Sequence, residues 1–542
     1  MRFLIPALLA LSAAPASAAA PPPKLLIMIS VDQLSADLFA QYRRHFTGGL
    51  ARLQEGAVFP SGYQSHAASE TCPGHATLLT GSRPARTGII ANSWIDPAAP
   101  RADKNIYCAE DESVAGSTSL RYTPSAIHLR GRVLGDRLRA SGGGRTLVVA
   151  GKDRSAIMMG GANADAIFWW GSAGFATYAG HAAPPAVAEA NRAADAVIAR
   201  PAAARPLPTL CRARDRAVPL DGAGGVTVGS GRLVSTAGDR SLYRATPGFD
   251  AAVIALADAL RREMRLGRGE GSDLLALGLA ASDYVGHAFG TQGAEMCIQL
   301  LALDALLGEF FARLDAEGID YAVALSADHG GLDAPERARE QGATAAARVD
   351  PALAPAAMGA AIAGRLGLAA PVLVGEAPFG DIYLAPAVSR RRRDRVLRAA
   401  VAAYRAHPQV AAAFTRAELA AAPAPAPSAS PEAWSLLDRA KASFDPARSG
   451  DLVVLLKPGI MPIAVPSRGY SATHGSAWSY DRRVPVLFWR KGMAGFEQPL
   501  PVETVDIMPT LAALAGVRVD PAEIDGRCLD LDAGPGDTCA AR

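Results

Sequence analysis

The sequence predicts an α/β fold with a mostly parallel central sheet, helices on both faces of that sheet, and inserted cap segments. Short apolar runs bounded by turn signals, which are typical of buried strands, recur along the chain with helical stretches between them. Strands that alternate with helices favour a parallel sheet covered on both sides. We expect strands at Leu25–Val31, Thr146–Ala150, Leu274–Ala280, Tyr321–Ser326, Leu452–Leu456 and Val484–Trp489. We expect helices at Ala251–Met264, Glu295–Leu314 and Val505–Leu514, the last beginning near Thr504 or Asp506.

Two segments interrupt this alternation. Residues 155–250 are irregular, and residues 335–450 combine alanine-rich helices with the low-complexity piece Ala420–Pro431, which is typical of an exposed linker. We therefore expect residues 24–520 to form one domain with insertions at about 155–250 and 335–450 that could cap a site. Residues 521–542 are expected to form a C-terminal tail.

The composition excludes intrinsic disorder and gives no reason to expect a nucleic-acid partner. Of 542 residues, 50% are hydrophobic and 20% are charged, which is enough apolar content for a sizeable core. The net charge is +3, from 55 basic and 52 acidic residues. A balance this close provides no long-range attraction for nucleic acid or for an anionic membrane.

The N-terminus has the pattern of a secretory signal. Arg2 supplies the positive charge, Phe3–Ala13 the apolar stretch, and Ala16–Ala18 the small-residue cleavage site. We expect residues 1–18 to be removed and the mature protein to be exported, to the periplasm or the exterior. The chain contains no other uninterrupted apolar run of eighteen residues, so no membrane span is expected after cleavage.

The six cysteines include no C-x-x-C pair, which argues against a structural zinc knuckle. An even number of cysteines in an oxidising compartment permits three disulfides. Cys528 and Cys539 are the easiest pair to propose because they close a short loop. The other pairings stay open among Cys72, Cys108, Cys211 and Cys297.

Carboxylates and histidines fall where predicted strands end. In open α/β sheets the ligand site lies at the carboxyl ends of the strands, so these side chains should gather at one edge. Each residue alone has a simpler interpretation: a helix N-cap, a solvated helix face, or a turn whose glycines adopt positive φ. Because the chain has only nine histidines, their joint placement favours a metal site. The candidate ligands are Asp32, Asp283, His287, Asp328, His329 and His474.

These residue types suit two zinc ions. Imidazole nitrogen and carboxylate oxygen are ordinary zinc ligands. Two metals about 4 Å apart can hold both the attacking and the leaving oxygen of an in-line displacement. Another divalent metal, such as manganese or a mixture with calcium, stays open.

A candidate nucleophile lies in residues 69–81, which read as a loop entering a short helix with Pro73 in its first turn. Thr71 then lies at the helix N-terminus, where free N–H groups and the helix dipole favour an anion. A hydroxyl at this position could attack phosphorus. From the local sequence alone, however, the interpretation of Thr71 as an N-cap is favoured.

The order of these motifs resembles the alkaline phosphatase superfamily, from residue 25 to about residue 515. Residues 71–81 resemble the nucleophile region of that superfamily, and residues 31–34 resemble its first metal strand. Its other metal motifs are similar to residues 282–287, 327–330 and 473–475, and one of its common helices is similar to residues 505–511. Within the superfamily the match is closest to the phosphate-irrepressible alkaline phosphatases with a threonine nucleophile. Asn92 lies where that family has an asparagine that holds a phosphoryl oxygen, and Lys152 and Arg154 match its Lys-x-Arg pair.

The resemblance implies a zinc-dependent phosphatase that acts on small-molecule phosphate monoesters. Thr71 would attack phosphorus and form a phosphothreonine intermediate, while Asn92, Lys152 and Arg154 would contact the non-bridging oxygens. The dianion of a monoester fits two cationic side chains better than a diester does. The implied metal sets are Asp283, His287 and His474 for one ion, and Asp32, Asp328, His329 and the Thr71 oxygen for the other.

Other activities stay open beside this one. A phosphodiesterase or nucleotide pyrophosphatase would use the same metals but would not require the lysine–arginine pair. A sulfatase would need a proline two residues after the nucleophile and an arginine two further, whereas Pro73 follows Cys72 directly and Ala76 stands at the arginine position. A phosphoglycerate mutase would use serine, and a non-catalytic metal-binding protein would show no turnover. The physiological substrate, the oligomeric state and the role of Cys72 are not predicted.

Overall fold

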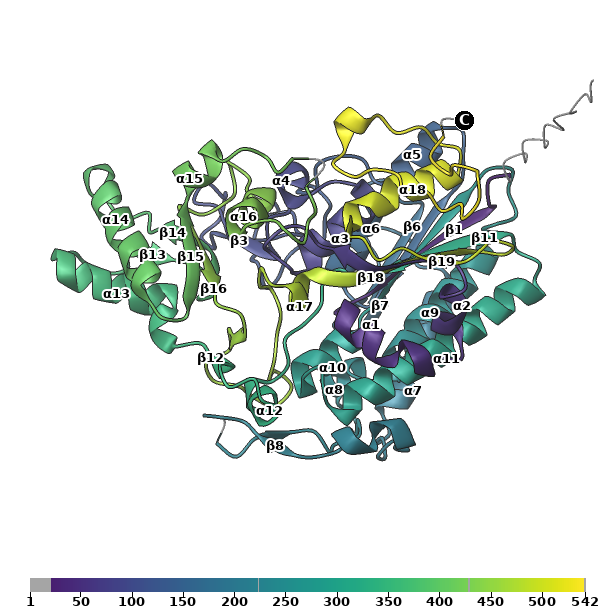
Figure 1. The fold of residues 1–542 in the computed structure, drawn as a ribbon, viewed down its shortest axis with the longest axis horizontal. Coiled ribbons are helices and arrows are strands. Elements are labelled where there is room, and N and C mark those ends of the chain that lie inside the picture. The colour runs from purple at the N-terminus through teal and green to yellow at the C-terminus, as the bar shows by residue number, and fades with distance from the viewer. Residues whose placement is uncertain (1–20, 223, 427–428, 541–542) are drawn as a thin grey trace, which may run out of the picture.

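A computed structural model describes residues 21–222, 224–426 and 429–540, so the predicted signal segment lies outside the described residues (Figure 1). Its centre is a ten-stranded sheet. In spatial order the strands are β19 (Phe496–Glu497), β2 (Ala57–Tyr63), β18 (Arg483–Arg490), β11 (Tyr321–Ser326), β1 (Leu25–Val31), β10 (Asp273–Leu279), β5 (Thr146–Ala150), β6 (Ala166–Gly171) and β7 (Gly174–Ala176), with β20 (Val502–Glu503) paired to β2.

The middle of this sheet is parallel and its flanks are mixed. Strands β11, β1, β10, β5 and β6 run parallel, while β18 is antiparallel to both β11 and β2, and β7 is antiparallel to β6. All seven residues of β1 are buried, as expected for an apolar run with neighbours on both sides and helices on both faces. The predicted α/β class with a mostly parallel sheet is therefore confirmed.

Helices cover both faces of the sheet, and each face has its own apolar core. Side chains alternate along each strand, so Leu25, Ile27 and Ile29 enter one core while Leu26 and Met28 enter the other. The first core includes α1 (Ala36–Tyr42), α2 (Gly49–Leu53), α7 (Pro185–Ile198), α9 (Pro247–Glu263), α10 (Ala281–Phe289) and α11 (Ala294–Ala316). The second includes α3 (Thr71–Thr80), α5 (Leu134–Ala140), α6 (Asp153–Gly160) and α18 (Ile507–Leu514).

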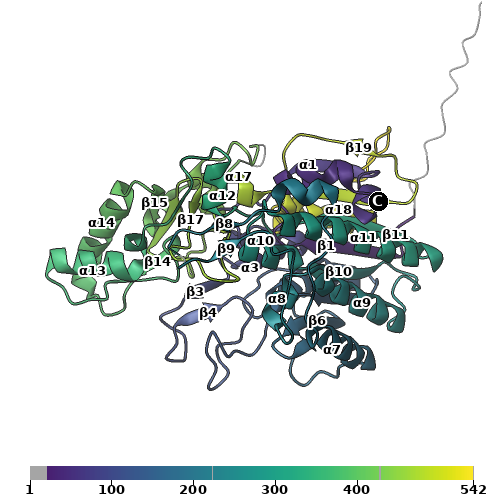
Figure 2. The same ribbon diagram turned by 90° about the horizontal axis from the view of Figure 1, so that it is seen from below.

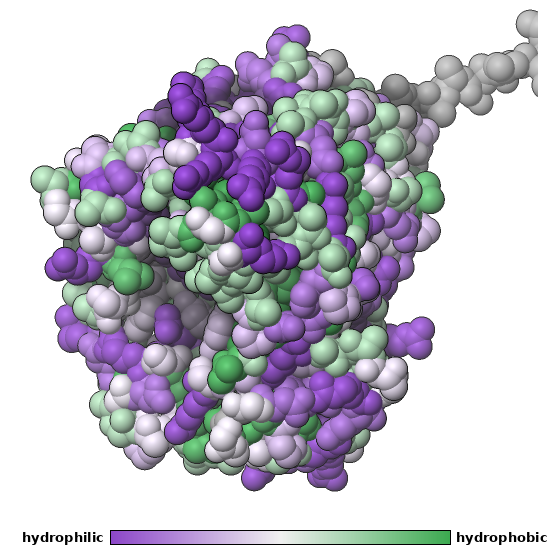
Figure 3. All heavy atoms as spheres, turned by 90° about the vertical axis from the view of Figure 1, so that its left-hand side faces the viewer, coloured by the Kyte–Doolittle hydropathy of each residue, from purple (hydrophilic) through white to green (hydrophobic). Residues whose placement is uncertain are grey.

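Residues 347–461, which we call the cap, form a separate layer beside the central sheet (Figures 1 and 2). The cap contains a four-stranded antiparallel sheet with its own apolar core. Its strands are β13 (Leu373–Val374), β14 (Gly380–Leu384), β16 (Leu452–Leu456) and β15 (Val410–Thr415), and its helices are α13 (Pro355–Leu366), α14 (Arg390–Ala406), α15 (Arg416–Ala421) and α16 (Leu436–Ser443). Hydrophilic side chains gather over the upper part of this end of the molecule (Figure 3).

The prediction that Leu452–Leu456 belongs with the other strands of the main sheet is wrong. This run is β16, and it pairs with β14 and β15 in the cap. Leu452, Val454 and Leu456 face one apolar cluster, while Val453 and Leu455 face another. A strand buried on both sides has the same sequence pattern in either sheet, so the apolar run could not show which sheet it joins.

Part of residues 155–250 belongs to the central sheet and its covering helices, although their irregular sequence predicted an insertion. Strands β6 and β7 extend the central sheet, and α6 and α7 pack against its two faces. The chain then passes through a 3-10 helix at Thr209–Arg214 and a short hairpin, β8 (Val218–Pro219) with β9 (Thr227–Val228), before α8 (Arg240–Arg244).

Three disulfides join the six cysteines: Cys72–Cys108, Cys211–Cys297 and Cys528–Cys539. The last is the pair that the sequence favoured. Across the described residues, the longest and most apolar helices do not reach the length and hydropathy of a bilayer span.

Candidate active site

The predicted ligand residues converge at the carboxyl end of the central sheet. Asp32 directly follows β1, Asp328 and His329 follow the neighbouring β11, and Asp283 lies in the first turn of α10, which follows β10. These three strands are adjacent, so their ends bring the side chains together. His474 comes from a loop that follows the cap rather than from a strand of the central sheet, and it reaches the same place.

Two histidines point at one carboxylate. The Nε2 atoms of His287 and His474 lie 3.2 Å and 3.4 Å from Asp283 Oδ1. Asp283 is 1% exposed, so it does not lie on a solvated helix face as its i, i+4 spacing with His287 allowed. Burial would raise the pKa of Asp283, but the neighbouring His287 imidazole and the Lys152 ammonium hold it well below its usual value.

A second group forms around Asp328. His329 Nε2 lies 3.2 Å from Asp328 Oδ2 and 3.5 Å from Asp32 Oδ1, and His75 Nδ1 lies 3.1 Å from Asp328 Oδ2. The rings of His329 and His474 stack with their centroids 3.6 Å apart, which joins this group to the first.

The geometric grouping differs in detail from the sets that the resemblance implies. Ligand atoms within 4.8 Å of one another define one trio of Asp283, His329 and His474 and another of Asp32, His75 and Asp328. His329 thus falls with the first trio, and His75 takes a place in the second. Sequence reasoning did not single out His75 as a ligand, although it lies one helical turn after Thr71 and is one of only nine histidines.

Backbone carbonyls fix the orientation of three imidazoles. The Nδ1 atoms of His287, His329 and His474 lie 2.8–2.9 Å from the carbonyl oxygens of Ala472, Gly330 and Ser69. A carbonyl oxygen accepts only from a protonated Nδ1. In a neutral imidazole the proton on Nδ1 leaves a lone pair on Nε2, and here each Nε2 is directed at the carboxylates. Neutral imidazoles held in this way are suited to bind a metal cation.

The donor set of these residues fits a divalent metal. Within the described part of the chain, the buried atoms Asp32 Oδ1, Asp328 Oδ2 and His329 Nε2 have no hydrogen-bond partner. Buried polar atoms without partners are costly in a folded protein. Three carboxylates and several imidazole nitrogens that face one another form a mixed oxygen and nitrogen set of the kind that zinc prefers.

Lys152 bridges the two groups. Its Nζ lies 2.6 Å from Asp32 Oδ2, 2.6 Å from Asp283 Oδ2 and 3.4 Å from Thr71 Oγ1. Burial would lower the pKa of Lys152, but the charges of Asp283 and Asp32 raise it above its usual value. Lys152 therefore stays protonated and brings a fixed positive charge to the Thr71 hydroxyl.

Thr71 is the first residue of α3 and is fully buried. The N-cap of this helix is Glu70, so the interpretation of Thr71 as the cap is wrong; Glu70 itself makes no side-chain cap bond. The positive end of the α3 dipole and the Lys152 ammonium therefore both lie at the Thr71 hydroxyl, where an anion would be stabilised.

Asn92 is anchored beside Thr71. Its Oδ1 accepts from Cys72 N at 2.8 Å, and its backbone N–H donates to Glu70 Oε2 at 2.7 Å. The Cys72–Cys108 disulfide adds a covalent link to this segment, and Cys108 N donates to Asn92 O at 2.9 Å. Cys72 thus ties the start of α3 to the segment that carries Asn92, a role that the sequence left open.

Arg154 lies two residues after Lys152, in the first turn of α6. Burial alone would lower the pKa of its guanidinium, but Tyr107, Tyr284 and Asp153 raise it further above its usual value. Its Nε is buried and has no hydrogen-bond partner among the described residues. Arg154 and Lys152 line the same cleft, so the two cations of the predicted pair lie together.

Gln33 was missed by the sequence reasoning. Its φ is 68°, in the left-handed region that a glutamine rarely adopts. In this conformation its backbone N–H donates to Asp328 Oδ1 at 3.2 Å and its Nε2 donates to Asp283 Oδ1 at 3.3 Å. Gln33 thus orients one carboxylate of each group, and no local sequence signal marks it.

The two glycines after His329 are required for close packing and not for positive φ. Neither Gly330 nor Gly331 has a left-handed backbone. A Cβ on Gly330 would come within 2.1 Å of the Tyr480 carbonyl oxygen, and one on Gly331 within 2.8 Å of the Gln33 side chain. The interpretation of this motif as an ordinary turn with positive φ is therefore wrong.

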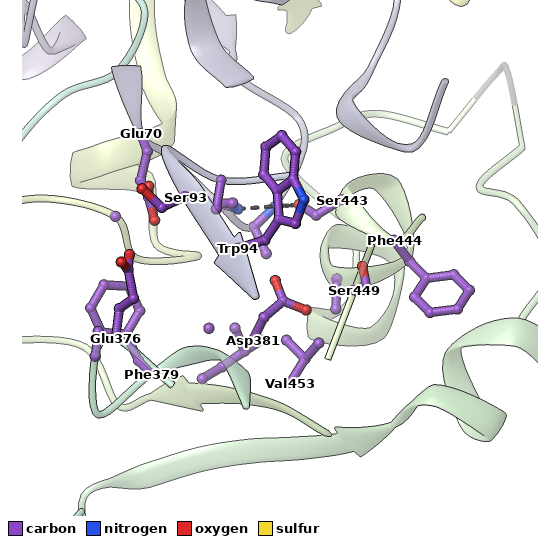
Figure 4. Close-up of a pocket in the computed structure, with 18 of the residues that line it drawn as sticks. Glu70, Ser93, Trp94, Glu376, Phe379, Asp381, Ser443, Phe444, Ser449 and Val453 are labelled. Carbon is purple, nitrogen blue, oxygen red and sulfur yellow. Dashed lines mark hydrogen bonds between the residues drawn. The ribbon is translucent and has the colours of Figure 1, made fainter. Parts of the chain in front are cut away.

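A small pocket of about 80 Å³ lies between the cap and the loops around α3 (Figure 4). The carboxyl groups of Glu70, Glu376 and Asp381 line it beside the indole of Trp94, and we call it the acidic pocket. Burial raises the pKa of Glu70 to about 7 and that of Asp381 to about 6. Once these three carboxyl groups are ionised, this side of the site is unfavourable for an additional anion.

Comparisons with known proteins agree with this geometry. Residues 26–477 match the family of type I phosphodiesterases and nucleotide pyrophosphatases. Alkaline phosphatase PhoK of Sphingomonas sp. is 54% identical over 531 residues, which cover 97% of this chain and 94% of that protein. Alkaline phosphatase PhoD of Zymomonas mobilis is 46% identical over 530 residues, covering 96% and 90%.

The crystal structure of wild-type alkaline phosphatase PafA has the same fold, with a TM-score of 0.78 and 24% identity over 92% of this chain and 97% of that one. Fold and sequence together define an enzyme of the alkaline phosphatase superfamily. Within that superfamily, the chain belongs to the type I phosphodiesterase and nucleotide pyrophosphatase family.

Proposed function

We propose that the protein is an exported alkaline phosphatase that hydrolyses phosphate monoesters through a phosphothreonine on Thr71. The observation that carries this proposal is the position of Thr71 Oγ1, at the start of α3 and 3.4 Å from the Lys152 ammonium. A buried hydroxyl beside a protonated lysine is placed to be stabilised as an oxyanion and to act as a nucleophile.

In the proposed reaction Thr71 Oγ attacks phosphorus, and the bond from phosphorus to the ester oxygen breaks as the new bond forms. Lys152 and Arg154 supply positive charge to the non-bridging oxygens, and the Asn92 amide is held at the same helix end by Cys72 N. Water then hydrolyses the phosphothreonine, which releases phosphate and regenerates Thr71. Positioning and charge carry most of such a transfer.

Asp32, Asp283, Asp328, His287, His329 and His474 would hold two zinc ions, with Thr71 Oγ as a further ligand and His75 adjacent to Asp328. Zinc bound there would supply the positive charge that favours the alkoxide form of a hydroxyl. The carbonyl bonds of the three histidines keep Nε2 free for that purpose. Gln33 holds the Asp283 and Asp328 carboxylates in place.

The names of the relatives support a monoesterase. PhoK and PhoD are both called alkaline phosphatases, and so is PafA, which is 28% identical over 530 residues. One crystallised variant of PafA replaces a threonine, an asparagine, a lysine and an arginine, the residue types of Thr71, Asn92, Lys152 and Arg154. Export is supported by the signal-like residues 1–18 and by three disulfides.

The test compares kcat/KM for p-nitrophenyl phosphate and bis-p-nitrophenyl phosphate in the zinc-loaded protein and in Lys152→Ala/Arg154→Ala. We expect the wild type to prefer the monoester by orders of magnitude. The double variant should lose roughly 10²- to 10³-fold or more on the monoester, since each lost charged donor costs on that scale. Thr71→Ala serves as the reference for loss of the nucleophile and should remove both activities.

A second candidate is a phosphodiesterase on the same site, which the description of the matching family favours. That function predicts the reverse pattern in the same experiment. A wild type that prefers the diester, together with a double variant that is hardly affected, would reject the monoesterase proposal.

A further inference from the structure

A cleft of about 600 Å³ opens beside Lys152 and Arg154. We call it the basic cleft. It is bounded by the loop at Leu120–Pro124, by the end of β6, by α8 and by Tyr284 of α10. Because Lys152 lines this cleft and its Nζ also reaches Thr71 Oγ1, the basic cleft borders the proposed phosphate site.

The charge in this cleft is strongly one-sided. Five cations line it, and Asp153 is the single carboxylate among its lining residues. The oxygens of Asp153 are already engaged, because the hydroxyls of Tyr107 and Tyr122 donate to them at 2.8 Å and 2.5 Å. The five cations are Arg121, Lys152, Arg154, Arg240 and Arg244.

Several of these guanidinium groups have no counter-ion from the protein. In the described residues, Arg121, Arg154 and Arg244 have no carboxylate within 4.0 Å, whereas the buried Arg261 pairs with both Asp258 and Glu317. Arg240 pairs with Asp195 through Nη1.

Buried donors without partners lie in the same place. Arg154 Nε, Arg240 Nε and Arg240 Nη2 are shielded from solvent, and no described residue accepts from them. Leaving buried charged donors unpaired is unfavourable. An anion bound beside these guanidinium groups would offset their positive charge.

Tyr284 holds Arg244 close to the phosphate end of the cleft. Arg244 Nη1 donates to the Tyr284 hydroxyl at 3.1 Å, and its guanidinium carbon lies 4.4 Å from the centre of that ring. Lys152 Nζ lies 5.4 Å from the centre of the same ring. A guanidinium held against an aromatic face loses less freedom when it binds an anion than a mobile surface arginine does.

We propose that the basic cleft binds a second anionic group carried by the leaving group of the substrate. The preferred substrates are then phosphate monoesters whose alcohol part bears a carboxylate or another phosphate. This inference rests on the proposed monoesterase function. The acidic pocket on the cap side of Thr71 disfavours the opposite orientation, because an anion there would face Glu70, Glu376 and Asp381.

The test uses two substrates that differ only at the end remote from the phosphate: sorbitol 6-phosphate, which is uncharged there, and 6-phosphogluconate, which carries a carboxylate. We expect kcat/KM to be about tenfold higher for 6-phosphogluconate, the scale of one good charge-assisted hydrogen bond. The ratio should fall to about one in Arg244→Ala/Arg121→Ala. It should also shrink in high salt, since the arginines are partly solvent-accessible.

Arg398→Ala is the matched control, because it removes the same charge from an exposed position on α14 in the cap and should keep the wild-type ratio. Arg121 lies in an exposed loop, so Arg121→Ala alone gives a variant that should fold normally and lower the ratio in part. Equal kcat/KM values in the wild type, or a ratio that survives in the double variant, would overturn the inference and leave the monoesterase proposal intact. If the zinc-loaded wild type hydrolyses neither substrate nor p-nitrophenyl phosphate, the proposed function fails and this inference fails with it.

Discussion

Asp250, on α9, is a buried carboxyl group whose surroundings determine its charge. It is fully buried, and its two oxygens accept from Ala281 N at 3.0 Å and from Gln299 Nε2 at 2.8 Å. Burial raises the pKa of Asp250 to about 7 despite these bonds. The native state therefore retains a proton that the unfolded chain releases near pH 4, so the contribution of Asp250 to stability falls as pH rises from about 4 to 7.

We predict that Asp250→Asn stabilises the protein relative to the wild type increasingly from pH 5 to pH 7, by up to a few kcal/mol, since one pKa unit corresponds to about 1.4 kcal/mol. Asparagine keeps the bond to Ala281 N, and Gln299 can turn its amide to accept from the new NH₂ group because its Oε1 has no partner within the described residues. The measurement is the free energy of unfolding in denaturant at several pH values. A difference between variants that does not change with pH would contradict the assignment.

Residue types could be predicted from the sequence better than the contacts that orient them. Asp32, Asp283 and Asp328 were found because they lie at strand ends, where topology alone brings them together. Gln33 and His75 were not, because their roles depend on a left-handed backbone and on the packing of α3 against Asp328. Neither feature leaves a signal in local propensity.

At the scale of elements, the contact between α3 and the end of β11 positions the nucleophile. Gly74 lies in the first turn of α3, and a Cβ there would stand 2.2 Å from the Asp328 carbonyl oxygen. The obstacle is backbone, so it cannot move aside as a flexible side chain could. The missing side chain of Gly74 therefore allows Thr71 and Asp328 to belong to one site.

We predict that Gly74→Ala lowers kcat/KM at least about 100-fold, because a displacement of about 1 Å from the reacting geometry costs on that scale. It should also destabilise the fold by about 1–3 kcal/mol through overpacking. Gly364→Ala is the matched control: Gly364 is also helical, on α13, and has no atom within 4 Å of a Cβ. The control should be neutral or slightly stabilising. Full activity in Gly74→Ala would show that α3 can move without cost.

The elements themselves were predictable where their pattern was local. Strands Leu25–Val31, Thr146–Ala150 and Tyr321–Ser326 have the bounds that the apolar runs predicted. Strand β2 was missed, since Pro60, Ser61 and Gly62 interrupt its apolar character. Strand β16 was placed in the wrong sheet because pairing partners lie far away in the chain, and no local pattern specifies them.

At the scale of the whole molecule, the cluster of buried carboxylates at the site affects the stability of the folded protein. Asp32, Asp283 and Asp328 are at most 1% exposed, and Lys152 is the cation that bridges two of them. Burial and the charge of Asp328 raise the pKa of Asp32 well above its usual value. Like charges held this close together are unfavourable without further positive charge.

We predict that removal of divalent metal with a chelator lowers the melting temperature by at least about 5 °C, and that added zinc restores it, because a ligand that binds only the folded state stabilises it by mass action. Elemental analysis of the purified protein should give two zinc ions per chain. His474→Ala, which removes one donor, should retain less zinc and gain less from its addition. A melting temperature that is insensitive to the chelator, in a protein without bound metal, would contradict the two-zinc proposal.

The site is assembled from segments that lie far apart in the chain. His474 donates to the carbonyl of Ser69, 405 residues earlier, and Gln33 donates to Asp328, 295 residues later. No fragment shorter than the span from Asp32 to His474 contains all the proposed ligands. A ribosome must therefore finish almost the whole polypeptide before the first complete copy of the site can exist, and a chain that crosses a membrane unfolded can acquire its metals only on the far side.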